Sequence, residues 1–309
     1  MINLNEPYYS NGKLLISGEY LVLDGALSLA IPTKYGQSLI VEPIDEPRLI
    51  WESLDENGHL WFKDDILIKQ ITSPIVSSND LSNRLVQILN TAKQLNPDFL
   101  NTMGGFKVTT SLTFPKNWGL GTSSTLINNI ANWAGIDAYK LLEKTFGGSG
   151  YDIACAQHNH PIFYHLENDK PIVEDVEFNP LFKQHLYFVY LNKKQNSRDG
   201  ISNYKENRTH IKSSIIQINE ITSHLVSCKS LEDFDSLILK HEHIISNIIK
   251  QQPVKEVLFN DFSGQIKSLG AWGGDFILAT SKGNPTAYFR SKGFETVISY
   301  DSMVLKNKT

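Results

Sequence analysis

The sequence predicts an α+β protein with two domains. Strand-like and helix-like patterns both occur along the chain, but without the regular β-α alternation that is typical of a parallel α/β sheet. The pattern also changes after about residue 170. Because 309 residues suffice for two domains of ordinary size, we expect an N-terminal domain over residues 1–170 and a C-terminal domain over residues 171–309.

The first third of the chain is expected to consist mostly of strands. Largely apolar or β-rich runs at residues 13–23, 37–41 and 48–51 predict strands, and Asn57-Gly58 predicts a hairpin turn between two more. An amphipathic helix follows Asp80, with apolar residues three and four apart, and Asn96-Pro97 ends it. A strand at 106–112, a helix at 126–133 and a helix capped by Asp137 come next.

The second half should contain long helices between short strands. A strand is expected at residues 185–191 and helices at 211–225 and 231–249, the latter capped by Ser230. Pro253 should begin another helix that ends near Lys267. Three closing strands are expected at residues 276–279, 287–289 and 296–299.

Composition excludes several classes of protein. The net charge is −4, with no basic cluster, so nucleic acid is not an expected partner. Only Cys155 and Cys228 are present, which excludes a disulfide framework and fits a reducing cytoplasm. No apolar stretch reaches the roughly 18–20 residues that a membrane span needs. The expected setting is therefore the cytoplasm, without a membrane partner.

The most informative segment is Gly119-Leu120-Gly121-Thr122-Ser123-Ser124, between the strand at 106–112 and the helix at 126–133. Glycines allow left-handed backbone angles and close approach of a ligand. The unpaired N–H groups of the first helical turn, together with the helix dipole, favour an anion such as phosphate. An ordinary glycine turn before a capped helix explains the same pattern, so both interpretations stay open on these residues alone.

Three other segments contain residues that could bind a ligand or take part in a reaction. Lys13 opens an apolar strand, where its ammonium could meet phosphate oxygens or simply face solvent. Asp152 follows the run from Gly147 to Gly150, where it could accept a proton from a substrate hydroxyl or merely stabilise a helix dipole. The glycine-dense run from 269 to 275 could approach a ligand or form a packing corner.

Together, these segments resemble the motifs of the GHMP kinase superfamily, named for galactokinase, homoserine, mevalonate and phosphomevalonate kinases. Residues 12–25 resemble its N-terminal motif, and the loop that begins at Pro115 resembles its Pro-x-x-x-Gly-Leu-Gly-Ser-Ser-Ala phosphate loop. Gly-Ser-Gly-Tyr-Asp, which ends at Asp152, and residues 269–279 resemble its remaining two motifs. The resemblance implies a ribosomal-protein-S5-like N-terminal domain and a ferredoxin-like C-terminal domain, with the active site in the cleft between them.

The resemblance also implies roles for individual residues. ATP phosphates would lie on the loop from Gly119 to Ser124, and Ser123 would help to hold Mg²⁺, although Thr122 and Ser124 replace the usual Ser and Ala. Asp152 matches the catalytic aspartate and Lys13 the N-terminal lysine of the family. Glu143 is a candidate second metal ligand, with a shorter spacing to the aspartate than expected. Substrate contacts are implied for Glu19, Ser197, Gly273, Gly274 and Asp275.

The implied activity is ATP-dependent phosphorylation of a small molecule. The N-terminal motif reads most like the mevalonate and phosphomevalonate branch, and Glu19-Tyr20 and Asp275 favour phosphomevalonate. A non-catalytic sensor of ATP and a metabolite is the alternative, as is a kinase for an unrelated hydroxylated metabolite. A small-molecule substrate is the expected partner, and a homodimer stays open.

Overall fold

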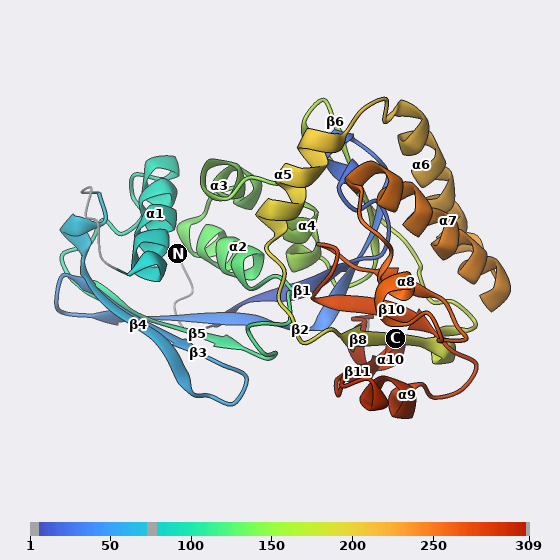
Figure 1. The fold of residues 1–309 in the computed structure, drawn as a ribbon. Helices are drawn as coiled ribbons and strands as arrows, with labels where there is room; N and C mark the ends of the chain where they lie inside the picture. The colour runs from blue at the N-terminus through green and yellow to red at the C-terminus, as the bar shows by residue number, and fades with distance from the viewer. Residues whose placement is uncertain (1–5, 73–78, 307–309) are drawn as a thin grey trace. The chain divides into compact units, whose positions relative to one another are not determined.

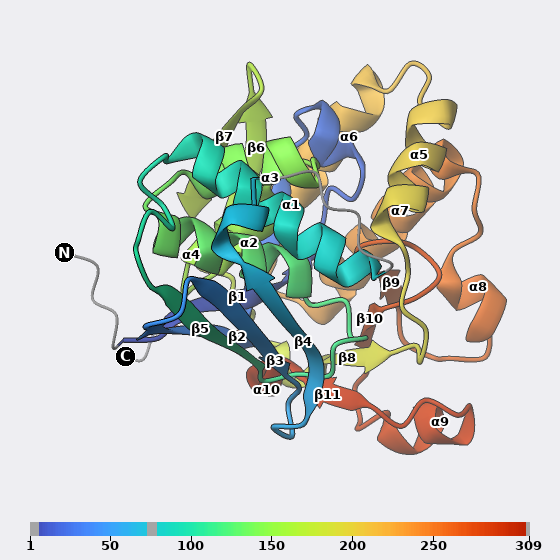
Figure 2. The ribbon, with the colours of Figure 1, turned by 90° about the vertical axis from the view of Figure 1, so that its left-hand side faces the viewer.

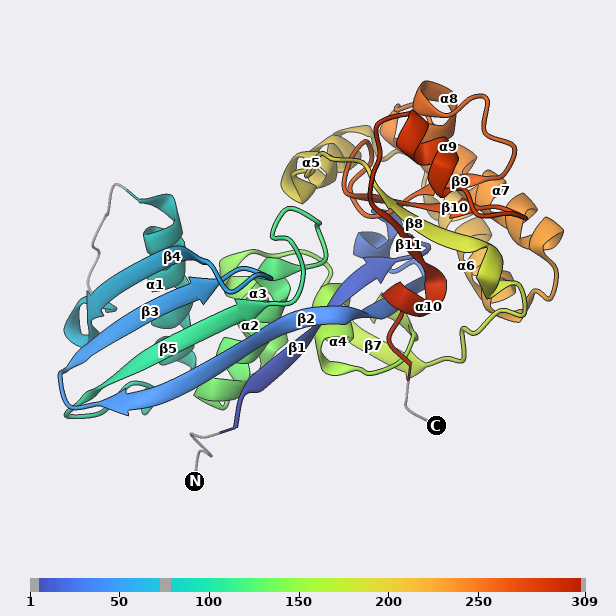
Figure 3. The same ribbon diagram turned by 90° about the horizontal axis from the view of Figure 1, so that it is seen from below.

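The computed structural model describes residues 6–72 and 79–306. These residues form two compact units, and neither unit is continuous in the sequence. The first comprises the described parts of Met1–Gly12, Tyr35–Lys116 and Leu120–Gln157; the second comprises those of Lys13–Lys34, Asn117–Gly119 and His158–Thr309. This division differs from a single boundary at residue 170, because strands β1 (Tyr8–Leu15) and β2 (Ser28–Ile44) each run through a junction. Figure 3 shows β2 as one long strand.

The first unit contains a sheet with strand order β4-β3-β5-β2. Its further strands are β3 (Arg48–Leu54), β4 (Leu60–Leu67) and β5 (Gly105–Leu112). Strands β3 and β5 are parallel, whereas the other neighbours are antiparallel. The predicted hairpin at Asn57-Gly58 is confirmed: Asp55 Oδ1 accepts the N–H groups of Asn57 and His59, and Gly58 has a φ of 79°.

Helices cover one face of this sheet, as Figures 1 and 2 show for α1, α2 and α3. The helices of the unit are α1 (Asp80–Leu95), α2 (Thr122–Ala134), α3 (Ala138–Thr145) and α4 (Tyr151–Gln157). Their apolar faces and the sheet form one core, in which Trp133 packs edge-on against Phe99 and Phe106 at centroid distances of 4.7 and 5.5 Å. The core holds α2, and with it the glycine-rich turn, on the sheet.

The second unit contains the start of β2 paired with β6, and a separate four-stranded sheet. Its strands are β6 (Ile162–Glu167), β7 (Lys170–Asp175), β8 (Leu186–Tyr190), β9 (Ile266–Ser268), β10 (Phe276–Thr280) and β11 (Val297–Ser299). The order β11-β8-β10-β9 places the strands fourth, first, third and second in chain order, as in the ferredoxin-like arrangement. The prediction of an α+β fold with a ferredoxin-like C-terminal part is confirmed.

Helices connect and cover these strands. They are α5 (Ser197–Asn207), α6 (Lys212–Ser227), α7 (Leu231–Ile249), α8 (Val254–Leu258), α9 (Thr286–Ser291) and α10 (Tyr300–Met303). Figure 1 shows α6 and α7 side by side, and apolar residues of both are buried. Within the described ranges, no helix is long and apolar enough to cross a membrane.

Most predicted elements are confirmed, and three are wrong. The strand predicted at 13–23 ends at Leu15, and residues Leu21–Asp24 form a 3-10 turn closed by Gly25. The helix after Pro253 stops at Leu258, because residues near Lys267 pair with β10 instead. The strand predicted at 287–289 belongs to helix α9, where Asn284 Oδ1 accepts the N–H of Thr286 and Phe289 is buried in the core.

Candidate active site

The glycine-rich turn has the backbone geometry of an anion-binding loop. Gly119 and Gly121 have φ angles of 71° and 97°, which favour glycine. Gly121 is the N-cap of α2, and no side chain caps the helix. The first turn of α2 also lacks an acidic residue. The N–H groups at this helix end could therefore bind an anion, and the predicted phosphate contact stays a prediction.

The three hydroxyl groups that follow Gly121 differ in their surroundings. Ser124 is buried, and its Oγ donates to the carbonyl of Gly121 at 2.9 Å. Thr122 is partly exposed and Ser123 is exposed. Since Ser124 is occupied by the loop itself, Ser123 and Thr122 are the hydroxyls that could reach a ligand or a metal ion.

A buried polar network fixes α2 on the first unit. Thr125 Oγ1 donates to Gln37 Oε1 at 2.8 Å, and Asn129 Nδ2 donates to the carbonyl of Gln37 at 2.9 Å. Ser10 Oγ donates to Asn129 Oδ1 at 2.7 Å, and Asn128 Nδ2 donates to Ser10 Oγ at 2.9 Å. Sequence reasoning missed these positioning residues. The pair of asparagines inside an otherwise apolar helix was the available signal, because buried amides need partners.

Asp152 lies in the first turn of α4, which packs against α2 in the same unit. Gln157 Nε2 in α4 donates to Asn128 Oδ1 in α2 at 2.8 Å. The carboxylate of Asp152 is partly exposed, and its Oδ1 accepts the N–H of Ile153 at 3.1 Å. Burial, the Cys155 thiol and the Asp152 carboxylate together raise the pKa of Tyr139, so Asp152 lies near a phenol that stays protonated. The structure thus joins the helices of two predicted motifs.

Lys13, Gly119 and Asp275 meet in the second unit. Lys13 Nζ donates to the carbonyl of Gly119 at 3.1 Å. The carboxylate of Asp275 lies against the same glycine, where a Cβ atom would come within 2.4 Å of Asp275 Cγ. Burial raises the pKa of Asp275, whereas Lys13, the N–H of Gln195 and Lys194 oppose this shift. Three residues that the sequence assigned to different motifs therefore form one group.

The C-terminal glycine motif packs against the segment that follows β8. A Cβ atom on Gly274 would come within 2.5 Å of Gln195 Cγ, and one on Gly273 within 3.0 Å of Gln195 Nε2. Gln195 Nε2 also donates to the carbonyl of Trp272 at 2.8 Å. Ser197 is exposed at the start of α5, but Asn196 is the residue that caps this helix. Packing accounts for both glycines, and their predicted contact with substrate stays a prediction.

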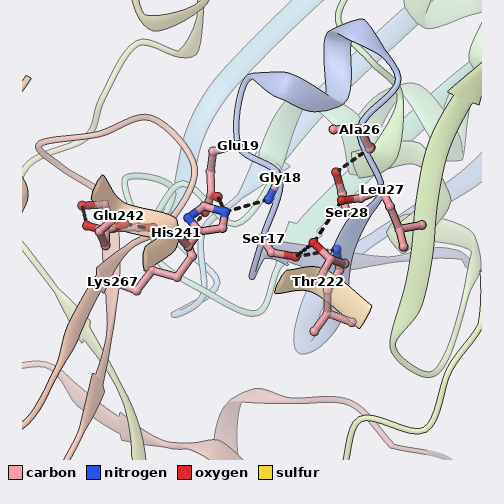
Figure 4. A network of polar contacts seen from close by, with 12 residues as sticks. Ser17, Gly18, Glu19, Ala26, Leu27, Ser28, Thr222, His241, Glu242 and Lys267 are labelled. Carbon is pink, nitrogen blue, oxygen red and sulfur yellow. Dashed lines mark hydrogen bonds and ion pairs between the residues drawn. The ribbon is translucent and has the colours of Figure 1, made fainter. Parts of the chain in front are cut away.

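Glu19 lies in a buried ionic cluster in the second unit. Figure 4 shows it beside His241, Glu242 and Lys267, and all four side chains are at most 2% exposed. Glu19 Oε1 accepts a hydrogen bond from Lys267 Nζ, which also donates to the carbonyl of Ser268 at 2.8 Å. The predicted contact of Glu19 with substrate stays a prediction, and in this structure the carboxylate binds Lys267.

The protonation states in this cluster follow from its contacts. His241 Nε2 accepts the N–H of Gly18 at 3.0 Å, and burial followed by Lys267 lowers the pKa of His241, so the ring is neutral. The approach of Glu19 Oε2 to the same nitrogen, at 3.2 Å, is then not an ion pair. Burial raises the pKa of Glu242 to about 8, while Lys267 lowers it and Glu19 raises it. At neutral pH the Glu242 side chain is therefore protonated.

We expect this cluster to make stability depend on pH. The pKa of Glu242 is about 8 when folded, against about 4.5 when unfolded, so its stabilising effect is complete below pH 4.5 and is lost as the pH rises through 8. Between these values, the free energy of unfolding should fall by roughly 1 kcal/mol per pH unit from this group. Urea denaturation from pH 6 to 9 should show a flatter dependence for Glu242→Gln than for the unmodified chain.

The matched control is Glu232→Gln, on the same helix but exposed and paired with Lys282. It should leave the slope in this pH range unchanged. An identical slope in Glu242→Gln and the unmodified chain would contradict the assignment of a buried, protonated Glu242.

The predicted metal ligands do not form a protein cage. Glu143 is exposed on α3, and Ser123 is exposed at the start of α2. Residues 6–72 and 79–306 include no group of three or more His, Cys, Asp or Glu side chains that could hold a metal ion. Mg²⁺ needs no such cage in phosphoryl-transfer proteins, because one or two protein oxygens together with substrate phosphates and waters suffice. An exposed Ser123 hydroxyl beside an uncapped helix end fits that mode of binding.

Comparison with known proteins identifies the fold. No protein-family model matches the sequence, and no curated protein matches it significantly. Among solved structures, the mevalonate kinase of Methanococcus jannaschii has a TM-score of 0.73 at 15% identity, over 99% of both chains. The chain has the GHMP kinase fold.

Other structures with the GHMP kinase fold match over similar lengths. The phosphomevalonate kinase of Streptococcus pneumoniae, in complex with phosphomevalonate and AMPPNP, has a TM-score of 0.71 at 16% identity, over 95% of this chain and 99% of that one. The galactokinase of Lactococcus lactis, complexed with galactose, has a TM-score of 0.66 at 12% identity, over 94% and 89%. These structural matches establish the GHMP kinase fold, and at identities this low they establish the fold alone.

Proposed function

We infer that this protein is an ATP-dependent kinase for a small metabolite, with mevalonate or phosphomevalonate as the acceptor. The observation that carries the inference is the uncapped start of α2, with two left-handed glycines and no acidic residue in its first turn. In the same unit, the helix of Asp152 is hydrogen-bonded to α2. A phosphate site and a candidate base on neighbouring helices are the parts that a phosphoryl transfer requires.

Phosphoryl transfer requires few protein side chains, because it depends mainly on positioning of the reactants and neutralisation of phosphate charge. The N–H groups of residues 122–124 would bind the phosphates of ATP. Mg²⁺, which Ser123 and Glu143 would help to hold, would neutralise phosphate charge. Asp152 would accept the proton of the acceptor oxygen, and Lys13 would stabilise the negative charge that develops there.

Two lines of support narrow the acceptor. The similar structures include mevalonate kinase and a phosphomevalonate kinase that binds phosphomevalonate and the ATP analogue AMPPNP. In the sequence, Glu19-Tyr20 and the Gly-Gly-Asp that ends at Asp275 favour phosphomevalonate. We therefore rank phosphomevalonate first and mevalonate second.

The direct test is a turnover assay with Mg·ATP and each acceptor in parallel. We expect ADP to form at a rate that depends on one of the two acceptors, and a phosphorylated product to appear in equal amount. Binding of ATP and of an acceptor without turnover would instead support a non-catalytic sensor. Failure to bind Mg·ATP at millimolar concentration would reject both functions.

A further inference from the structure

Two opposite charges of the second unit meet on one glycine. Lys13 extends from β1, and its Nζ donates to the carbonyl of Gly119 at 3.1 Å. The carboxylate of Asp275 packs where a side chain on Gly119 would begin. A Cβ atom on Gly119 would lie 2.6 Å from each carboxylate oxygen. Both side chains therefore lie next to Gly119. Among the described residues of the unit, Lys13 is also the charge that most strongly opposes the effect of burial on the pKa of Asp275.

The backbone around Asp275 fixes the direction of its carboxylate. Its own φ is 52°, a left-handed angle that is uncommon outside glycine. Its N–H donates to the carbonyl of Lys193 at 2.7 Å, and its carbonyl accepts the N–H of Leu191 at 2.8 Å. Its Oδ1 accepts the N–H of Gln195 at 3.1 Å. These three hydrogen bonds leave the carboxylate little freedom to turn elsewhere.

A carboxylate held in this way suits a lysine better than a substrate. Its partners are backbone groups, Gly119 and the nearby Lys13. A second lysine, Lys194, lies between Lys193 and Gln195, which both hydrogen-bond Asp275. Lys13 and Lys194 both counteract the effect of burial on the pKa of Asp275, so positive charge lies near this carboxylate.

We propose that Asp275 is a positioning residue whose negative charge holds the Lys13 side chain beside Gly119. The proposal rests on the proposed function, in which Lys13 stabilises the charge that develops on the acceptor oxygen. It changes the role that the sequence implied for Asp275, from contact with substrate to action through Lys13. The side chain acts on the reaction only by way of the lysine.

The test compares Asp275→Asn with the unmodified chain. Asparagine has the same shape and can still accept the N–H of Gln195, but it has no charge. The first readout needs neither ATP nor acceptor: competitive acylation of lysines by acetic anhydride, followed at each pH by mass spectrometry of the Lys13 peptide. Without the carboxylate, a larger fraction of Lys13 is uncharged amine, and its acylation at pH 8 should rise by about threefold to tenfold.

The second readout is kinetic. In Asp275→Asn, kcat should fall by about tenfold or more and its alkaline limb should move to lower pH, whereas KM for ATP and for the acceptor should change less than threefold. Asp261→Asn is the matched control, because this exposed aspartate of the same unit pairs with Lys292. It should alter neither Lys13 acylation nor kcat. Thermal unfolding of each variant checks that the fold is retained.

Several outcomes would overturn the proposal. Unchanged acylation of Lys13 in Asp275→Asn means that the carboxylate does not act on the lysine. A raised KM for the acceptor with unchanged kcat means that Asp275 contacts substrate, as the sequence implied. Activity restored by excess Mg²⁺ means that Asp275 is a metal ligand. If the unmodified chain phosphorylates neither acceptor, the proposed function fails, but the acylation experiment still decides whether Asp275 controls Lys13.

Discussion

Asp152→Asn should lower kcat by about 10²- to 10⁴-fold, the usual contribution of a positioned general base. The amide cannot accept the proton of an acceptor hydroxyl, but it can still accept the N–H of Ile153, so α4 should remain intact. The affinity for ATP should stay within about threefold, because the phosphates bind to the start of α2 rather than to Asp152. Steady-state kinetics together with calorimetric titration of ATP measure both quantities.

The control for this variant is Asp137→Asn. Asp137 caps α3 in the same unit, where its Oδ1 accepts the N–H of Tyr139 at 2.8 Å, and asparagine caps helices equally well. Its kcat should equal that of the unmodified chain. If Asp152→Asn also stays within a fewfold of that value, Asp152 is not the base, and another group must take the proton.

The second large effect is expected from Gly121→Val, which should weaken ATP binding by about tenfold or more. Gly121 has a φ of 97°, an angle that a β-branched residue adopts only under strain, and it begins the helix whose N–H groups would bind phosphate. A shift of the loop to relieve that strain moves those donors. Tenfold corresponds to about 1.4 kcal/mol of binding free energy, well within reach of calorimetry.

Gly135→Val is the matched control at the other end of α2. Gly135 is the C-cap, with a φ of 63°, and a Cβ atom there would meet no atom within 4 Å. Both variants should lose stability, since valine is strained at either position. Only Gly121→Val should lose ATP affinity. Equal affinities in the two variants would show that the glycine turn is a simple helix start without a phosphate site.

The elements that were predicted correctly are indicated by residues within or next to the element itself. Helix α7 begins and ends where the periodicity indicated, and Ser230 Oγ accepts the N–H of Asp233 as a cap should. The glycine-rich turn was predictable because glycines, hydroxyl residues and a following helix lie within a few positions. A resemblance over four ordered motifs then supplied the fold, which local patterns alone could not.

The features that sequence reasoning missed or predicted wrongly include several that depend on pairing with other segments. Residues 266–268 form a strand because they pair with β10, a choice that no local pattern reveals. The grouping of Lys13 with Asp275 joins residues from opposite ends of the chain. The same holds for the pairing of Glu19 with Lys267, which turns an exposed-looking motif residue into an interior one. Spacing along a single sequence contains no information on such contacts.

No single cut in the chain separates the two units. The backbone passes from one unit to the other at five junctions: Gly12/Lys13, Lys34/Tyr35, Lys116/Asn117, Gly119/Leu120 and Gln157/His158. The second unit also joins early and late residues directly, because Thr33 bridges to Val304 and the N–H of Leu305 donates to the carbonyl of Pro32. During synthesis, the segment around residue 33 can therefore make these contacts only after residues 304 and 305 have left the ribosome. Neither unit can be produced as one uninterrupted fragment, and closure of the second is a late, long-range step in folding.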